Sequence, residues 1–127
     1  QKPLPHSIRQ LPKIDLHRHL DCSLRWSTVV ELNEQLGLVP SQQIEKLKAE
    51  FLVTEPMLNL EAVLTKFLNT QKLFLNAEIL ERMAFEACED AFNDGVLILE
   101  LRYAPTFIAE GGSGLSFEQI HTALLKG

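Results

Sequence analysis

One stretch of the chain carries most of the information about its architecture: Lys13-Ile-Asp-Leu-His-Arg-His-Leu20. The stretch follows Pro12 and alternates with a period of two, which is typical of a β-strand. One face of this strand would carry the polar residues Asp15, His17 and His19, followed by Asp21 beyond the strand. The opposite face would carry Ile14, Leu16, Arg18 and Leu20.

A second strand is predicted over residues 96–103, after Asn93-Asp94-Gly95 and before Pro105. Its apolar run is continuous, as in strands of a parallel sheet that are covered on both faces. Helices are predicted between and after the two strands, over residues 26–36, 42–50, 60–74, from 77 to about 93, and 117–126.

The order strand, helices, strand, helix is typical of βα units around a parallel sheet. Two parallel strands alone make a poor sheet, and such strands normally belong to a larger unit, such as a barrel of about 250 residues. We therefore predict an α/β fold in which residues 1–127 form one unit, the N-terminal part of a (β/α)8 TIM barrel.

Several residues predict where these helices begin and end. Thr28 with Glu31, and Ser116 with Gln119, have the spacing of capping boxes. Ser41 and Asn76 are expected N-caps, and Gly37 and the loop of residues 111–114 are expected breaks.

The formal net charge is −5 with no basic run, so neither nucleic acid nor an anionic membrane surface is an expected partner. No apolar stretch approaches the roughly 20 residues that span a bilayer, and we expect a cytoplasmic protein. Cys22 and Cys88 form no spaced framework, and both are expected to be buried, unpaired residues.

His17 and His19 project from the same side of the predicted strand, with Cβ atoms about 6–7 Å apart. At that separation both imidazoles can bind one metal ion, each nitrogen at about 2.0–2.1 Å. The pair lies at the C-terminal end of the strand, where barrels bind ligands. Spacing alone fits two ordinary hydrogen-bonded histidines equally well, but a half-buried polar face requires water or an ion, because unpaired polar burial costs about 1–3 kcal/mol per group.

The stretch from Leu11 to Arg25 closely resembles the start of the adenosine deaminase family, which opens Pro-Lys-x-(Asp/Glu)-Leu-His-x-His-Leu-(Asp/Glu)-Gly-(Ser/Ala). Residues 94–105 are similar to the end of the second barrel strand of that family, Glu-x-Arg-(Tyr/Phe)-(Ser/Ala)-Pro. Leu64-Thr-Lys-Phe67 resembles the helix that roofs the substrate pocket. Cys22 departs from the pattern, standing where the family has Gly, which narrows the space beside the nucleoside.

The resemblance implies a zinc-dependent enzyme that hydrolyses the 6-amino group of a purine nucleoside, converting adenosine to inosine and ammonia. It assigns His17 and His19 as two ligands of one Zn²⁺ and Asp21 as an acceptor for the ribose 5′-hydroxyl. It also assigns an apolar gate over the substrate to Leu60, Val63, Leu64 and Phe67.

The remaining ligands and catalytic groups of the family come from later strands, so the resemblance places no catalytic residue in this chain. Neither His6 nor His121 has a suitable position, and both are expected to be ordinary surface or packing residues. Catalytic zinc sites use three protein ligands and water, so we expect the 127 residues alone to be inactive.

Two other interpretations stay open. The chain could belong to another metal hydrolase of the amidohydrolase superfamily, since His-x-His on the first strand is widespread there. It could instead be a non-catalytic fragment that associates with itself or with a complementary C-terminal portion, because two barrel strands expose edges and an apolar interior. The sequence leaves open whether the purine is adenosine, adenine, AMP or a modified form.

Overall fold

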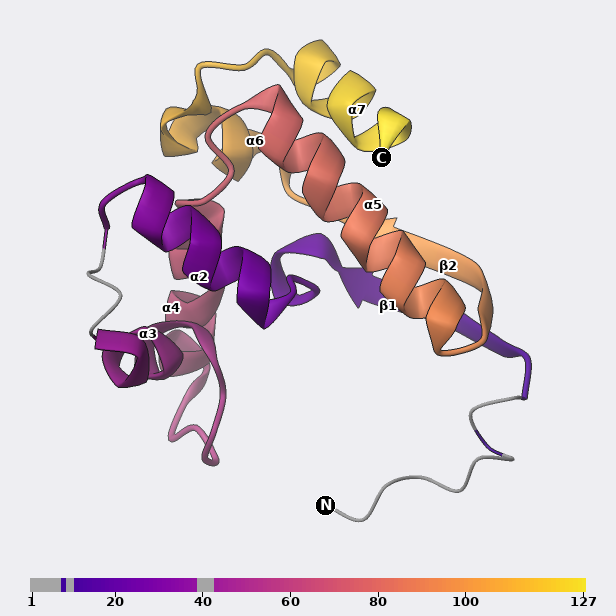
Figure 1. Ribbon diagram of the computed structural model, residues 1–127, viewed down its shortest axis with the longest axis horizontal. Coiled ribbons are helices and arrows are strands. Elements are labelled where there is room, and N and C mark those ends of the chain that lie inside the picture. Colours follow the sequence, from indigo (N-terminus) through magenta and orange to yellow (C-terminus); the bar gives the residue numbers. More distant parts are fainter. Residues whose placement is uncertain (1–7, 9–10, 39–42) are drawn as a thin grey trace.

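A computed structural model describes residue 8, residues 11–38 and residues 43–127 (Figure 1). The elements in chain order are β1 (Lys13–His19), η1 (Leu20–Cys22), α2 (Trp26–Gln35), α3 (Ile44–Phe51), α4 (Leu60–Gln71), α5 (Ala77–Asn93), β2 (Val96–Arg102), α6 (Pro105–Ile108), η3 (Ala109–Ser113) and α7 (Phe117–Lys126). His6 and the expected N-cap Ser41 lie outside the described residues.

The two strands pair in parallel, from Lys13 beside Val96 to His19 beside Arg102. This confirms the prediction of an α/β fold that forms the N-terminal part of a (β/α)8 barrel, since the chain returns through helices to start β2 at the same edge as β1. The C-terminal ends of both strands therefore lie at the same edge of the sheet, where ligands bind in such folds.

Helix α5 packs along β2 and also against α7, so it lies at the centre of the fold (Figure 1). Its fully buried side chains include Leu80, Met83 and Ala87, which meet Leu20 of η1 and Ile120 of α7 in one apolar core. The turn η1, directly after the histidines, is thereby fixed to the most buried part of the molecule.

The apolar strands are covered less than the sequence predicted. Ile14 and Leu16 of β1 are 62% and 55% exposed, and Leu97 and Ile98 of β2 are 68% and 53% exposed. The expectation of two covered faces is wrong for these 127 residues, because helices of this chain cover only part of the sheet.

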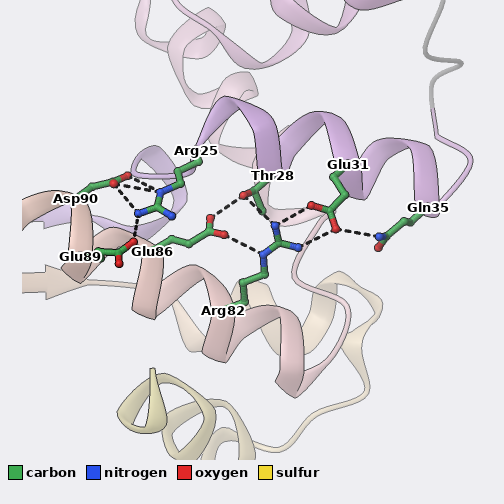
Figure 2. Close-up of polar contacts among 8 residues, drawn as sticks. All are labelled: Arg25, Thr28, Glu31, Gln35, Arg82, Glu86, Glu89 and Asp90. Atoms are coloured by element: carbon green, nitrogen blue, oxygen red, sulfur yellow. Dashed lines mark hydrogen bonds and ion pairs between the residues drawn. The ribbon is translucent and has the colours of Figure 1, made fainter.

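A polar network joins α2 to α5 (Figure 2). The Thr28 hydroxyl donates to Glu86 Oε2 at 2.7 Å, and Arg82 Nε donates to Glu86 Oε1 at 2.8 Å. The predicted capping box of Thr28 and Glu31 is wrong, since Arg25 is the N-cap of α2 and Glu31 instead accepts from Arg82. The side chains of Thr28 and Glu31 thus both form hydrogen bonds with residues of α5.

The other predicted helix ends agree better with the structure. Asn76 and Ser116 cap α5 and α7, the latter in a complete capping box with Gln119. Gly37 follows α2 with a φ of 63°, a left-handed conformation that favours glycine. Part of the loop expected over residues 111–114 belongs to η3, which ends at Ser113.

The expectation that both cysteines are buried is wrong. Cys22 and Cys88 are free and exposed. Cys88 lies in the apolar stripe predicted for α5, as does Phe92, which is 71% exposed. Among the described helices, none has the length and apolar character needed to cross a bilayer.

Candidate functional site

His17 and His19 converge at the end of β1. Their Nε2 atoms are 3.1 Å apart, and the rings stack with centroids 5.1 Å apart at an interplanar angle of 23°. Two nitrogens bound to one tetrahedral zinc ion at about 2.0–2.1 Å would be about 3.3 Å apart. The separation and the donor type therefore fit a shared cation, although the described residues contain no cluster of three or more possible ligands.

Asp15, in the same strand, stabilises the backbone that carries this histidine pair. Its Oδ1 accepts from the backbone N–H of His17 at 3.2 Å, and its Oδ2 accepts from Arg18 Nε at 2.8 Å. These two hydrogen bonds, that of His17 first, hold the pKa of Asp15 below its ordinary value of 3.8. The strict two-face alternation predicted for the strand is wrong here, because an irregularity in register between Asp15 and Arg18 brings their side chains together.

The turn after the strand is fixed by Ser23, whose hydroxyl donates to the carbonyl oxygen of His19 at 2.6 Å. Cys22 precedes it at the surface. Desolvation of the thiol, and secondarily the charge of Asp21, raise the pKa of Cys22 to about 11.

Asp21 lies behind His19 and is only 8% exposed. Its Oδ2 accepts from Gln71 Nε2 at 3.1 Å, and its Oδ1 lies 3.7 Å from His19 Nδ1, too far for a hydrogen bond. Oδ1 has no hydrogen-bond partner although it is buried. A buried carboxylate oxygen of this kind needs a hydrogen-bond donor.

An open cavity of about 560 Å³ adjoins the two histidines, and its lining includes His17, His19, Cys22 and Phe67. The Phe67 ring meets the His19 ring edge-on, with centroids 5.8 Å apart and an angle of 89°. Helix α4 thus places an aromatic ring beside the two histidines.

The other predicted gate residues lie away from this lining. Leu60 and Leu64 are 69% and 48% exposed, and Val63 is half-buried. Asp21 faces a separate cavity of about 70 Å³, together with Trp26 and Thr70.

Two polar residues at the site were given no role by the sequence: Asp15, which was placed only on the polar face of the strand, and Gln71. Gln71 had a visible signal, since it is the one polar residue in the apolar stripe of residues 60–74. Glu100 and Arg102 of β2 are both exposed, and neither forms a salt bridge among the described residues. His121 is exposed, as expected, and its Nδ1 lies 2.7 Å from the Tyr103 hydroxyl.

Comparisons with known proteins identify one family. The family model described as adenosine deaminase matches residues 12–127. An adenosine deaminase of Shewanella halifaxensis is 40% identical over 119 residues, which cover 93% of this chain and 35% of that protein. An adenosine deaminase of Clostridium perfringens is 37% identical over 122 residues, covering 95% and 36%.

Solved structures are similar as well. The crystal structure of an Arabidopsis N6-mAMP deaminase matches with a TM-score of 0.75 and 29% identity, covering 96% of this chain and 35% of that one. Arabidopsis ADAL complexed with IMP matches with a TM-score of 0.72 and 27% identity, covering 96% and 35%. The chain spans about a third of the length of these relatives.

Proposed function

This chain belongs to the adenosine deaminase family, and from that premise we propose that the whole protein is a zinc-dependent deaminase that hydrolyses the 6-amino group of adenosine, giving inosine and ammonia. The observation that carries the proposal is the 3.1 Å separation of the His17 and His19 Nε2 atoms at the C-terminal end of β1. A zinc ion held there would supply activated water at neutral pH.

His17 and His19 would each offer their Nε2 atom to the ion. Asp15 and Ser23 hold the strand and the turn in place around them. Two protein ligands are fewer than the three of catalytic zinc sites, so the remaining ligands must come from chain beyond these residues. The 127-residue chain by itself is accordingly expected to be inactive.

Asp21 supports a nucleoside rather than a nucleotide as the substrate. Its unpartnered, buried Oδ1 can accept a hydrogen bond from a ribose 5′-hydroxyl. A 5′-phosphate at the same place would bring two negative charges against a carboxylate in a poorly hydrated site, which is unfavourable.

Phe67 supports the same function by limiting water beside His19. The exposed side chains of Leu60 and Leu64 and the half-buried side chain of Val63 lie on the same helix, and a purine would complete their burial. A closed apolar pocket strengthens the electrostatic interactions of the reacting groups.

A second candidate is a 5′-monophosphate substrate, because the similar solved structures include an N6-mAMP deaminase and a protein bound to IMP. The test is an assay of the protein encoded by the complete reading frame, stripped of metal and reloaded with Zn²⁺, on adenosine, AMP and N6-methyl-AMP. Ammonia release from adenosine that needs zinc and is lost in His17→Ala, but kept in the control His121→Ala, is the expected result.

Turnover of N6-methyl-AMP alone would favour the second candidate. Turnover of none of these purines, but of amides, lactones or phosphoesters, would instead point to another hydrolase of the superfamily. A non-catalytic role would be indicated by inactivity together with self-association of the chain, or binding to a C-terminal portion, in size-exclusion chromatography.

A further inference from the structure

Gln71 is a buried amide in a helix whose other large side chains are mostly exposed. It is 8% exposed, and Thr70 and Gln71 are the buried residues of α4. An amide buried without hydrogen bonds costs about 1–3 kcal/mol, so a glutamine at this position needs a polar partner. That partner is Asp21, in the turn that follows the metal-binding strand.

The hydrogen bond from Gln71 Nε2 constrains the Asp21 carboxylate. Oδ2 is occupied by the amide at 3.1 Å, and within the described chain no other side chain donates to either carboxylate oxygen. The amide orientation is set by the same contact, because the reversed amide would place Gln71 Oε1 against a carboxylate oxygen. Asp21 Oδ1 is consequently the oxygen that remains free, beside His19 Nδ1.

We infer that Gln71 is a positioning residue, which orients Asp21 so that Oδ1 accepts a hydroxyl of the substrate. This inference rests on the proposed function, in which Asp21 accepts a hydrogen bond from the ribose 5′-hydroxyl. Gln71 lies one helical turn after Phe67, so α4 carries both the ring over His19 and the amide that holds Asp21. The same helix therefore determines how closed the pocket is and how the ribose is recognised.

The experiment compares adenosine with 5′-deoxyadenosine, which lacks the hydroxyl, on the complete enzyme and its Gln71→Leu variant. Leucine keeps the bulk of the side chain and removes the donor. Gln71→Leu is expected to lower kcat/KM for adenosine about tenfold and to leave kcat/KM for 5′-deoxyadenosine nearly unchanged, so discrimination between the substrates collapses. Asn69→Ala is the matched control, since it removes another amide hydrogen bond of α4, to the Glu50 carbonyl, without touching Asp21.

Equal losses with both substrates would assign Gln71 a merely structural role and overturn the inference, as would unchanged discrimination. If the enzyme deaminates no purine nucleoside, the proposed function fails, and the contact is judged by unfolding of the 127-residue chain instead. There, Gln71→Leu and Asp21→Asn are combined in a double-mutant cycle. Additive changes in the free energy of unfolding would overturn the orientation of Asp21 by Gln71, and non-additive changes would support that contact but not a role in substrate recognition.

Discussion

Arg82 on α5 forms a two-pronged contact with Glu31 on α2, with Nη2 2.7 Å from Oε2 and Nη1 2.9 Å from Oε1 (Figure 2). This parallel pairing is the strongest geometry available to a guanidinium and a carboxylate. Through Glu86, the same arginine connects to Thr28. The network holds α2 against α5, the helix that supports the sheet.

The buried part of this network predicts a stability effect. Thr28 is 1% exposed and Glu86 is 7% exposed. Thr28→Val keeps the shape of the side chain and removes the donor to Glu86, which should lower the free energy of unfolding by about 1–3 kcal/mol in urea titrations. Ser27→Ala, one residue earlier and exposed, should change it by less than about 0.5 kcal/mol. Equal effects of the two changes would contradict the assigned hydrogen bond.

The ion pair of Arg25 with Asp90 predicts a dependence on pH. Hydrogen bonds from Arg25 hold the pKa of Asp90 below its ordinary value of 3.8. A carboxyl group with a lowered pKa stabilises the fold above its unfolded-state value, and that contribution is lost as the pH falls through the folded-state pKa.

Asp90→Asn should therefore reduce stability at pH 7 by up to about 1 kcal/mol, since the pair is exposed, and the difference should vanish in strong acid. Urea titrations of both proteins across this range measure it. A difference that grows as the pH falls would show that the sign is wrong.

The histidine pair predicts metal binding by the chain itself. Calorimetric titration with Zn²⁺ should show weak binding of one ion per chain, which is lost in His17→Ala and in His19→Ala. His121→Ala is the control, because that histidine contacts Tyr103 and lies away from the cavity. Unchanged binding in the first two variants would remove the basis of the metal site.

We predict that the thiol of Cys22, although exposed, is alkylated slowly. Its pKa of about 11, raised from 9.0, corresponds to a thiolate fraction about a hundredfold lower near pH 8. In a Cys88→Ser background, alkylation by iodoacetamide followed by mass spectrometry should be slow, and Asp21→Asn should accelerate it. A rate equal to that of a free cysteine would refute the desolvated environment.

Phe67 predicts a catalytic effect in the complete enzyme. Phe67→Ala removes the ring that meets His19 and should lower kcat/KM for adenosine at least tenfold, which is about 1.4 kcal/mol of transition-state stabilisation. Leu68→Ala is a matched truncation on the same helix, at a residue that is 52% exposed, and should change kcat/KM little. Similar losses in both variants would mean that α4 acts only through stability.

The strands and their order could be predicted because local patterns determine them. The alternation around His17 and the apolar run from Val96 are properties of neighbouring residues, and parallel pairing follows from the helices between. The convergence of His17 and His19 needed only the period of a strand. The resemblance to a family supplied Asp21 and Phe67.

Contacts between distant residues could not be read from the sequence in the same way. Thr28 and Glu31 have the spacing of a capping box. Their side chains instead bond to the charged residues Glu86 and Arg82 of α5, more than 50 positions away, and of these only Glu86 is buried. The irregularity of β1 near Asp15 depends on pairing with β2. Gln71 could be recognised only as an exception in an apolar stripe, and its partner Asp21 appears only once the chain is folded.

The hydrogen bond from the His17 N–H to Asp15 affects how a cation would bind to the two histidines. This hydrogen bond fixes the backbone that carries both imidazoles, and their nitrogens already lie at nearly the spacing of zinc ligands. The rotational freedom of the strand is lost when the polypeptide folds, so little of it remains to be lost when a cation arrives. We therefore expect that a cation bound by the proposed metal site would meet two imidazoles already arranged for it, and that the size and charge of the ion would set the selectivity.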